Sequence, residues 1–259
     1  MKHSLRFLPF VALLLVTLVP NLPGQSRRPI AAENGKFLRI DGRDMLYGGK
    51  SPAQHFDISN SELKKRQYHY GMGREAFHAL LDPRYIDVAT ADSEWPDDAR
   101  FLVAFVDGEA KAYSVKDLTR HEIVNDTIGG HPIMAAYCIL ADLGAVYDRA
   151  YGDTTLTFGV SGYTYFDSKI WDGLDGFLIW DRDTESLWWP LIDRAVSGPL
   201  KGTALRKFDE AHWTDTTWTD IKARFPHAQV LQSNQDFKRP NSWPRLRNPT
   251  SIQRNFKQR

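Results

Sequence analysis

Residues 121–142 read HEIVNDTIGGHPIMAAYCILAD, and this stretch contains the clearest fold pattern of the chain. Two apolar runs, 123–124 and 133–137, flank Gly129-Gly130. This arrangement predicts a β-hairpin, because glycine reaches the positive φ angles that a tight turn needs. A His-Glu pair, an Asn-Asp pair and Cys138 lie in the same stretch. It is therefore also the first candidate for a functional site.

Hairpin patterns recur on both sides of this stretch. Apolar runs flank Asp41-Gly42, Asp107-Gly108 and the turns at 151–153 and 182–184. Helix patterns are fewer: one begins at 61–65 and resumes at 74–81, and a short one at 221–225 precedes a strand at 230–231. These patterns predict an α+β fold that is mainly β. We expect an antiparallel, hairpin-rich sandwich or a partly open barrel with a few peripheral helices.

The composition suits a packed domain. The 259 residues are 42% hydrophobic and 12% aromatic, and 33 Lys and Arg balance 32 Asp and Glu. Because no global field of one sign results, we expect no nucleic-acid partner. The leading functional hypothesis assigns the chain a small ligand or a protein partner, because no catalytic motif is complete while aromatic residues and glycine turns are many, and the cofactor is unknown.

The N-terminus has the pattern of a targeting segment. Lys2 and Arg6 precede an uncharged apolar run at 7–19. This pattern predicts a signal peptide or an N-terminal anchor over residues 1–25, and an uncleaved segment would attach the protein to the membrane through residues 5–22. Both alternatives predict an extracytoplasmic protein, periplasmic or secreted in the first and membrane-anchored in the second.

The remaining domain boundaries follow from composition. Residues 26–34 resemble a linker, residues 35–235 form a single β-rich domain, and the basic, proline-containing residues 236–259 are expected to be a disordered tail. Cys138 is the only cysteine, so no disulfide can form within the chain.

The pair His121-Glu122 resembles the start of the zinc-protease motif HExxH. That motif needs a second histidine four residues after the first, and Asn125 stands there. Asn125-Asp126 is typical of a turn or a cap. On a strand, His121 and Glu122 would point to opposite faces, so we expect a buried structural histidine bonded to a carboxylate.

Cys138 allows three interpretations. It could form a thiolate-imidazole metal site with His121 and His131, provided that the three side chains share one face. It could instead form a Cys-His nucleophile arrangement. The simplest interpretation is a small buried apolar side chain.

Two later segments carry further candidates. Ser161 lies in Gly-Val-Ser-Gly, which is similar to a nucleophile elbow but lacks the last glycine and the following helix. Asp181, Asp183 and Glu185 alternate around Arg182, as three carboxylates for Ca²⁺ or acid-base chemistry would, although a hairpin turn explains them as well. Of the neighbouring Trp188 and Trp189, we expect one in the core and the other either packed or free to stack on a flat ligand.

The chain resembles a known family over residues 101–231. The motifs that carry the resemblance are HEIVNDTIGG (121–130), LTFGVSG (156–162), DRDTESLWW (181–189) and SGPLKGTAL (197–205), in the same order and at similar spacing. They are typical of the bacterial domain of unknown function 3179 family. The resemblance implies an exported or membrane-associated protein and supplies no reaction.

This chain departs from the family pattern at one place. The usual Cys-Pro-Leu-Cys-Gly is here Cys138-Ile-Leu-Ala141-Asp142, so dithiol redox chemistry or a two-thiolate metal site cannot operate through that pair. The expected function is a non-catalytic extracytoplasmic module that binds a small ligand or a partner protein. The alternative is a metal-dependent or thiol-dependent enzyme that uses His121, Glu122 and Cys138. The candidate site residues are His121, Glu122, Asn125, Asp126, His131, Cys138, Ser161, Asp181, Arg182, Glu185 and Trp188.

Overall fold

The structure is a computed structural model, and it describes residues 33–76, 78–171, 173, 175–233 and 235. The expected signal peptide or anchor and the basic tail lie outside the described residues. Within those residues, no helix is both long and apolar enough to cross a membrane.

Within the described residues, the strands form five sheets. The six-stranded sheet comprises, in spatial order, β1 (Glu33–Asn34), β5 (Tyr68–Tyr70), β14 (Phe158–Tyr165), β15 (Gly176–Asp181), β16 (Leu187–Trp189) and β17 (Arg194–Ser197). The central sheet comprises β11 (Leu143–Asp148), β10 (His131–Cys138) and β9 (Ile123–Ile128). The five-stranded sheet comprises β18 (Trp213–Thr217), β7 (Arg100–Val106), β8 (Glu109–Ser114), β19 (Gln229–Leu231) and β6 (Tyr85–Asp87). The N-terminal sheet comprises β2 (Phe37–Ile40), β3 (Arg43–Leu46) and β4 (Phe56–Asp57), and a short hairpin comprises β12 (Ala150–Tyr151) and β13 (Thr154–Thr155).

Helices are short and peripheral. The described α-helices are α1 (Val88–Ala91), α2 (Val115–His121) and α3 (Trp218–Arg224). Short 3-10 turns cover Pro52–Gln54, Lys65–Gln67, Asp92–Glu94, Pro190–Ile192 and Glu210–His212. Thr217 caps α3, where its side chain accepts a hydrogen bond from the Asp220 N–H.

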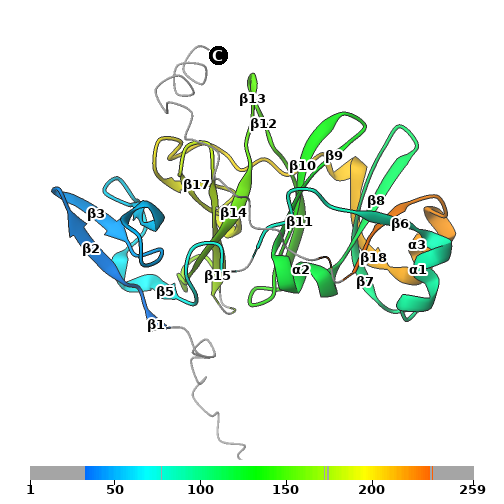
Figure 1. Ribbon diagram of the computed structural model, residues 1–259, viewed down its shortest axis with the longest axis horizontal. Helices are drawn as coiled ribbons and strands as arrows, with labels where there is room; N and C mark the ends of the chain where they lie inside the picture. The colour runs from blue at the N-terminus through cyan, green and yellow to red at the C-terminus, as the bar shows by residue number, and fades with distance from the viewer. Residues whose placement is uncertain (1–32, 77, 172, 174, 234, 236–259) are drawn as a thin grey trace, which may run out of the picture.

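The sheets lie in layers, which Figure 1 shows from left to right: the N-terminal sheet, the six-stranded sheet, the central sheet, the five-stranded sheet, and α1 with α3. An apolar cluster fills each boundary between neighbouring layers. No sheet of the described residues closes into a barrel. The expected mainly-β α+β class is therefore confirmed, in the form of a layered sandwich.

The central sheet is buried on both faces, and this explains the sequence of β10. Met134, Ala136 and Cys138 pack toward the six-stranded sheet, whereas Ile133 and Tyr137 pack toward the five-stranded sheet. A strand with two buried faces is continuously apolar rather than alternating. The predicted hairpin is confirmed, because β9 and β10 pair antiparallel on either side of Gly129-Gly130, which have φ angles of 51° and 76°.

Some local predictions of secondary structure are wrong. The helix expected to resume at residues 74–81 does not form in the described part of that range. The helix expected to begin at residues 61–65 is a 3-10 turn followed by β5, because Tyr70 pairs with Tyr163 of β14 and this tertiary pairing overrides local helix propensity. His121 ends α2 instead of lying on a strand. The side chain of Ser114 accepts the Asp117 N–H at 3.0 Å and starts this helix directly after β8.

Candidate functional site

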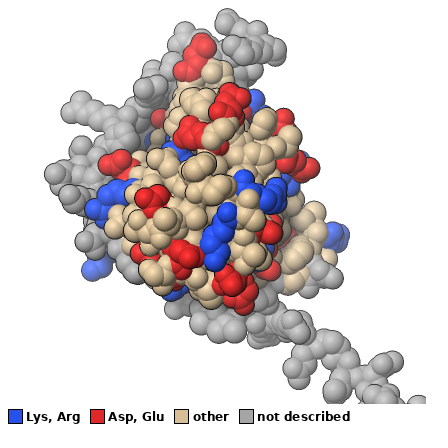
Figure 2. All heavy atoms as spheres, turned by 90° about the vertical axis from the view of Figure 1, so that its right-hand side faces the viewer, with Lys and Arg blue, Asp and Glu red and all other residues tan. Residues whose placement is uncertain are grey.

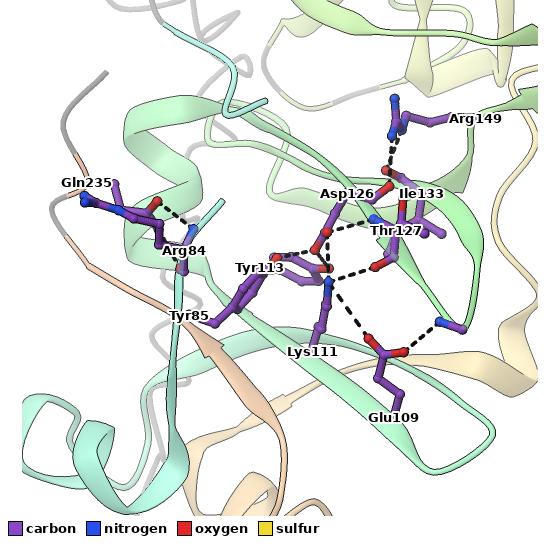
Figure 3. Close-up of polar contacts among 11 residues, drawn as sticks. Arg84, Tyr85, Glu109, Lys111, Tyr113, Asp126, Thr127, Ile133, Arg149 and Gln235 are labelled. Atoms are coloured by element: carbon purple, nitrogen blue, oxygen red, sulfur yellow. Dashed lines mark hydrogen bonds and ion pairs between the residues drawn. The ribbon is translucent and has the colours of Figure 1, made fainter. Parts of the chain in front are cut away.

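Asp126 on β9 lies at the centre of a buried polar group that we call the Asp126 cluster (Tyr85, Lys111, Tyr113, Asp126 and Thr127; Figure 3). Tyr85 and Tyr113 both donate to Oδ2 of Asp126, the latter at 2.7 Å. Lys111 Nζ and the Thr127 N–H donate to Oδ1 at 3.0 and 2.7 Å. Both carboxylate oxygens therefore have two donors each, and the cluster joins the central sheet to the five-stranded sheet.

The electrostatics of the Asp126 cluster favour a structural role. Burial, and then the negative charge of Asp126, raise the pKa of Tyr85 far above its usual value, and burial likewise raises that of Tyr113. The two phenols therefore remain hydrogen-bond donors at every physiological pH. Next to them, the guanidinium of Arg149 donates to three carbonyl oxygens, those of Asp126, Ile133 and Leu156. Figure 3 shows this arginine beside Asp126 and Ile133.

Asn125 joins the central sheet to the six-stranded sheet on the other face of β9. Its Nδ2 donates to the Phe158 carbonyl, and its Oδ1 accepts from the Phe158 N–H, both at 2.8 Å. The side chain is 3% exposed. The expectation that Asn125-Asp126 forms a turn or cap is wrong, because both residues lie on β9 and bond outward to neighbouring sheets.

His121, Glu122 and Cys138 lie near the same end of the central sheet. Nδ1 of His121 donates to the His78 carbonyl at 2.8 Å. Glu122 follows α2 with a φ of 56°, and burial raises the pKa of its carboxyl to about 7. Burial raises the pKa of the Cys138 thiol to about 11, and the charge of Glu122 adds to this increase. Cys138 is therefore protonated at neutral pH, which argues against a thiolate nucleophile or metal ligand.

His131 is separated from these residues by the length of β10. It begins the strand that Cys138 ends, so the two α-carbons lie about 23 Å apart at the usual rise of a strand. The ring of His131 instead lies 6.1 Å from that of Phe208. Within the described residues, no group of three or more His, Cys, Asp or Glu side chains could hold a metal ion.

Asp181 and Trp188 belong to one buried hydrogen-bond network. Asp181 Oδ2 accepts from Trp188 Nε1 and Thr184 Oγ1, both at 2.8 Å. Burial raises the pKa of Asp181 to about 6, although these hydrogen bonds act in the opposite direction. Trp188 is fully buried and belongs to the core. Trp189 is 2% exposed and lines a small pocket of about 280 Å³ with Tyr165.

Arg182 and Glu185 form part of a charged network with residues far away in the sequence. Arg182 binds Glu75 at 2.8 Å in a buried ion pair, and Glu185 accepts from Arg74 at 2.8 Å. The Glu75 carboxylate lies against Gly159, where an added Cβ would be 2.0 Å from its Oε1. Any larger residue at position 159, two before Ser161, would therefore collide with this carboxylate. The three alternating acids do not share one ligand, because the third, Asp183, accepts from the Thr157 N–H.

Ser161 lies in a β-bulge of β14, fully buried. Its hydroxyl donates to the carbonyl of Leu178 and accepts the Tyr163 N–H at 3.1 Å. A bulge in the middle of a strand, with the hydroxyl bonded to backbone, differs from the strand-turn-helix of a nucleophile elbow.

Sequence reasoning missed two features. His69 on β5 bonds through Nδ1 to Asp175, a fully buried carboxylate that also accepts from Thr164 at 2.6 Å. An open groove of about 400 Å³ lies between the turn of β7 and β8 and the end of α3, and Phe105 and Phe225 are among its lining residues. The turn dipeptide Asp107-Gly108 predicted the hairpin, but nothing local indicated that residues 224–228 would lie beside it.

A family model described as "Protein of unknown function (DUF3179)" matches residues 74–250, which is more than half of the chain. Neither a curated protein nor a solved structure matches the chain.

Proposed function

The chain belongs to the DUF3179 family, and we propose that it acts as a non-catalytic extracytoplasmic module that binds a small ligand. The main support is that the most polar motif residues are already occupied by the fold. Asp126 has four donors, Asn125 bridges two sheets, and Asp181 holds Trp188. A catalytic acid or base needs an accessible lone pair or proton, whereas these groups are already hydrogen-bonded to neighbouring residues.

Binding of a small ligand, rather than a large partner, is supported by the groove beside Phe105 and Phe225. Its volume of about 400 Å³ falls within the usual range of small-molecule sites. It is lined by half-buried rings and by charged side chains at its edge. The face shown in Figure 2, at the α1 and α3 end of the molecule, carries interspersed acidic and basic side chains, which gives no extended area of one sign for a polyanion.

The extracytoplasmic location is supported by the basic start and the apolar run at residues 7–19. Fractionation of cells that express the full chain tests it, together with sequencing of the mature N-terminus. We expect the protein outside the cytoplasm, and deletion of residues 5–22 should retain it inside. A full chain that fractionates with soluble cytoplasmic proteins would contradict the proposal.

The binding function is tested by a thermal-shift panel of small organic compounds on the purified full chain. We expect at least one class of compound to raise the melting temperature, and the Cys138→Ala variant to bind it equally well. A panel that shifts nothing, together with a tight complex with a host protein, would refute a small-ligand function. Turnover of any compound that disappears in Glu122→Gln would refute the non-catalytic assignment.

A second candidate, an enzyme using His121, Glu122 and Cys138, is favoured by one observation. The Glu122 carboxyl has a pKa of about 7, which is the value a general base needs at neutral pH. Elemental analysis of the full chain and of Cys138→Ala separates the candidates. Stoichiometric metal that is lost in Cys138→Ala would support the enzyme, whereas a metal-free protein with an unreactive Cys138 would remove its metal-dependent and thiol-dependent forms.

A further inference from the structure

The groove between the β7–β8 turn and the end of α3, here called the β7–β8 groove, contains two charged side chains, Asp107 and Arg224, that make no ion pair within the described residues. Among the residues that line it are Phe105, Asp107, Glu109, His212, Arg224 and Phe225. This differs from the Asp126 cluster nearby, where each carboxylate oxygen is bonded. The groove therefore contains charged side chains that are available to bind a ligand.

Aromatic rings form one wall of the β7–β8 groove. The ring centroids of Phe105 and Phe225 lie 5.0 Å apart with an interplanar angle of 36°. His212 meets Phe105 edge to face at 6.4 Å. Both phenylalanines are partly exposed. A planar ring entering the groove would extend this row, because aromatic pairs prefer offset or edge-to-face packing at such distances.

Side chains of both charges line the groove together with these rings. Asp107 lies in the β7–β8 turn, Glu109 begins β8, and Arg224 is the last residue of α3. Within the described residues, neither Asp107 nor Arg224 makes an ion pair, and the guanidinium lies 5.1 Å from the Phe225 ring. Glu109 accepts from the Gly129 N–H at 2.9 Å and keeps one oxygen 3.9 Å from Lys111. A ligand with one ammonium and one carboxylate could pair with both kinds of side chain.

From this arrangement we propose that the β7–β8 groove binds an aromatic α-amino acid or a similar small aromatic zwitterion. The ring lies against Phe105 and Phe225, the ammonium group faces Asp107 and Glu109, and the carboxylate binds Arg224. This deepens the proposed binding function and rests on it. The proposed ligand carries both charges because a lone cation would leave Arg224 without a counterion, and a lone anion would leave Asp107 without one.

The test is a ligand-observed NMR titration of the full chain with three compounds that share one ring. These are phenylalanine, 2-phenylethylamine, which lacks the carboxylate, and 3-phenylpropionate, which lacks the ammonium group. We expect phenylalanine to bind tightest and each partial ligand about threefold more weakly, as is usual for solvent-exposed ion pairs. Equal affinity for all three compounds would overturn the proposal.

Two variants should separate the two charges. Asp107→Asn should weaken the binding of phenylalanine and 2-phenylethylamine about threefold and leave that of 3-phenylpropionate unchanged. Arg224→Gln should weaken the binding of phenylalanine and 3-phenylpropionate about threefold and leave that of 2-phenylethylamine unchanged. Asp41→Asn is the matched control, because Asp41-Gly42 has the same turn geometry (φ 48° and 78°) as Asp107-Gly108 (φ 49° and 85°) in a different sheet. Phe225→Leu keeps the apolar volume and should weaken all three ligands roughly fivefold.

The outcomes distinguish the ligand class from the function. If other compounds of the panel bind while the phenylalanine series does not, the aromatic zwitterion is refuted and the binding module stands. If the series binds but Asp107→Asn and Arg224→Gln change its affinity no more than Asp41→Asn does, the ligand binds elsewhere than in the β7–β8 groove. If no small compound binds, both proposals fail.

Discussion

Asp126 and Glu122 are two carboxylates four residues apart in one motif, yet their surroundings differ. Asp126 is surrounded by donors from β6, β8 and β9, and both of its oxygens are satisfied. For Glu122, burial is the one resolved cause of its pKa shift, and it raises the value to about 7. Hydrogen bonds from donors stabilise a buried carboxylate, whereas burial that they do not offset raises its pKa, as it does at Glu122. The same side-chain chemistry therefore gives two different properties.

The largest expected effect on stability comes from removing the Asp126 carboxylate, which accepts the hydrogen bonds of its cluster. In Asp126→Ala, two phenols and one ammonium group lose their shared partner inside the protein, and we expect the free energy of unfolding to fall by about 4 kcal/mol. Guanidinium denaturation measures it. The control is Asp215→Ala, which breaks an ion pair of Arg100 at the surface and should cost less than about 1 kcal/mol. Similar losses in both variants would mean that the Asp126 cluster contributes little.

Glu122→Gln should stabilise the protein above neutral pH, in contrast to Asp126→Ala. Because the folded-state pKa of Glu122 is raised from 4.5 to about 7, the folded protein binds the proton more tightly than the unfolded chain, and wild-type stability falls as pH rises from about 4.5 through 7. Glutamine removes this titration. We expect Glu122→Gln to be more stable than wild type at pH 8 by up to about 3 kcal/mol and nearly equal to it at pH 4.5.

Melting curves between pH 4.5 and 8 measure this difference, with the exposed Glu94→Gln as control. Asp181, whose pKa is raised to about 6, should leave a residual slope of the same sign below pH 6 in both variants. A Glu122→Gln variant that loses stability at pH 8 would show that the carboxylate has a donor that its surroundings do not suggest.

Asn125 tests whether the second bridge of the central sheet is as important as the Asp126 cluster. Asn125→Ala leaves the N–H and the carbonyl of Phe158 without their partner in a dry interface, and we expect a loss of about 2 kcal/mol in denaturant unfolding. Asn60→Ala is a matched control, because Asn60 makes the same two bonds to the backbone of Gly198 at the surface. Water can replace those bonds, so this control should lose less than about 1 kcal/mol.

The sequence predicted what local patterns determine. Dipeptides such as Asp107-Gly108 and Gly129-Gly130 specify hairpins through their own φ angles. Local patterns in the sequence did not predict contacts between distant segments. Asp126 meets Tyr85 from 41 residues away, and Arg182 meets Glu75 from 107 residues away.

The same limit explains two of the errors in secondary structure. Residues 68–70 are a strand because β14 pairs with them, and His121 lies on a helix because α2 begins as soon as β8 ends. Candidate residues could therefore be named from the motif, but whether each was saturated or free depended on layers that no local pattern encodes.

The smallest expected effect concerns the influence of the Glu122 charge on Cys138. The thiol pKa of about 11 comes first from burial, and the charge of Glu122 raises it further. Glu122→Gln removes that charge, so the thiolate fraction at pH 8.5 should increase, and alkylation of Cys138 by iodoacetamide should accelerate roughly twofold. Because Cys138 is the only cysteine, mass spectrometry of the intact chain follows the reaction directly. If the reagent instead reached Cys138 only through global unfolding, the added stability of Glu122→Gln would slow alkylation. A slower rate would therefore show that reactivity reports opening of the layers and not the local field of Glu122.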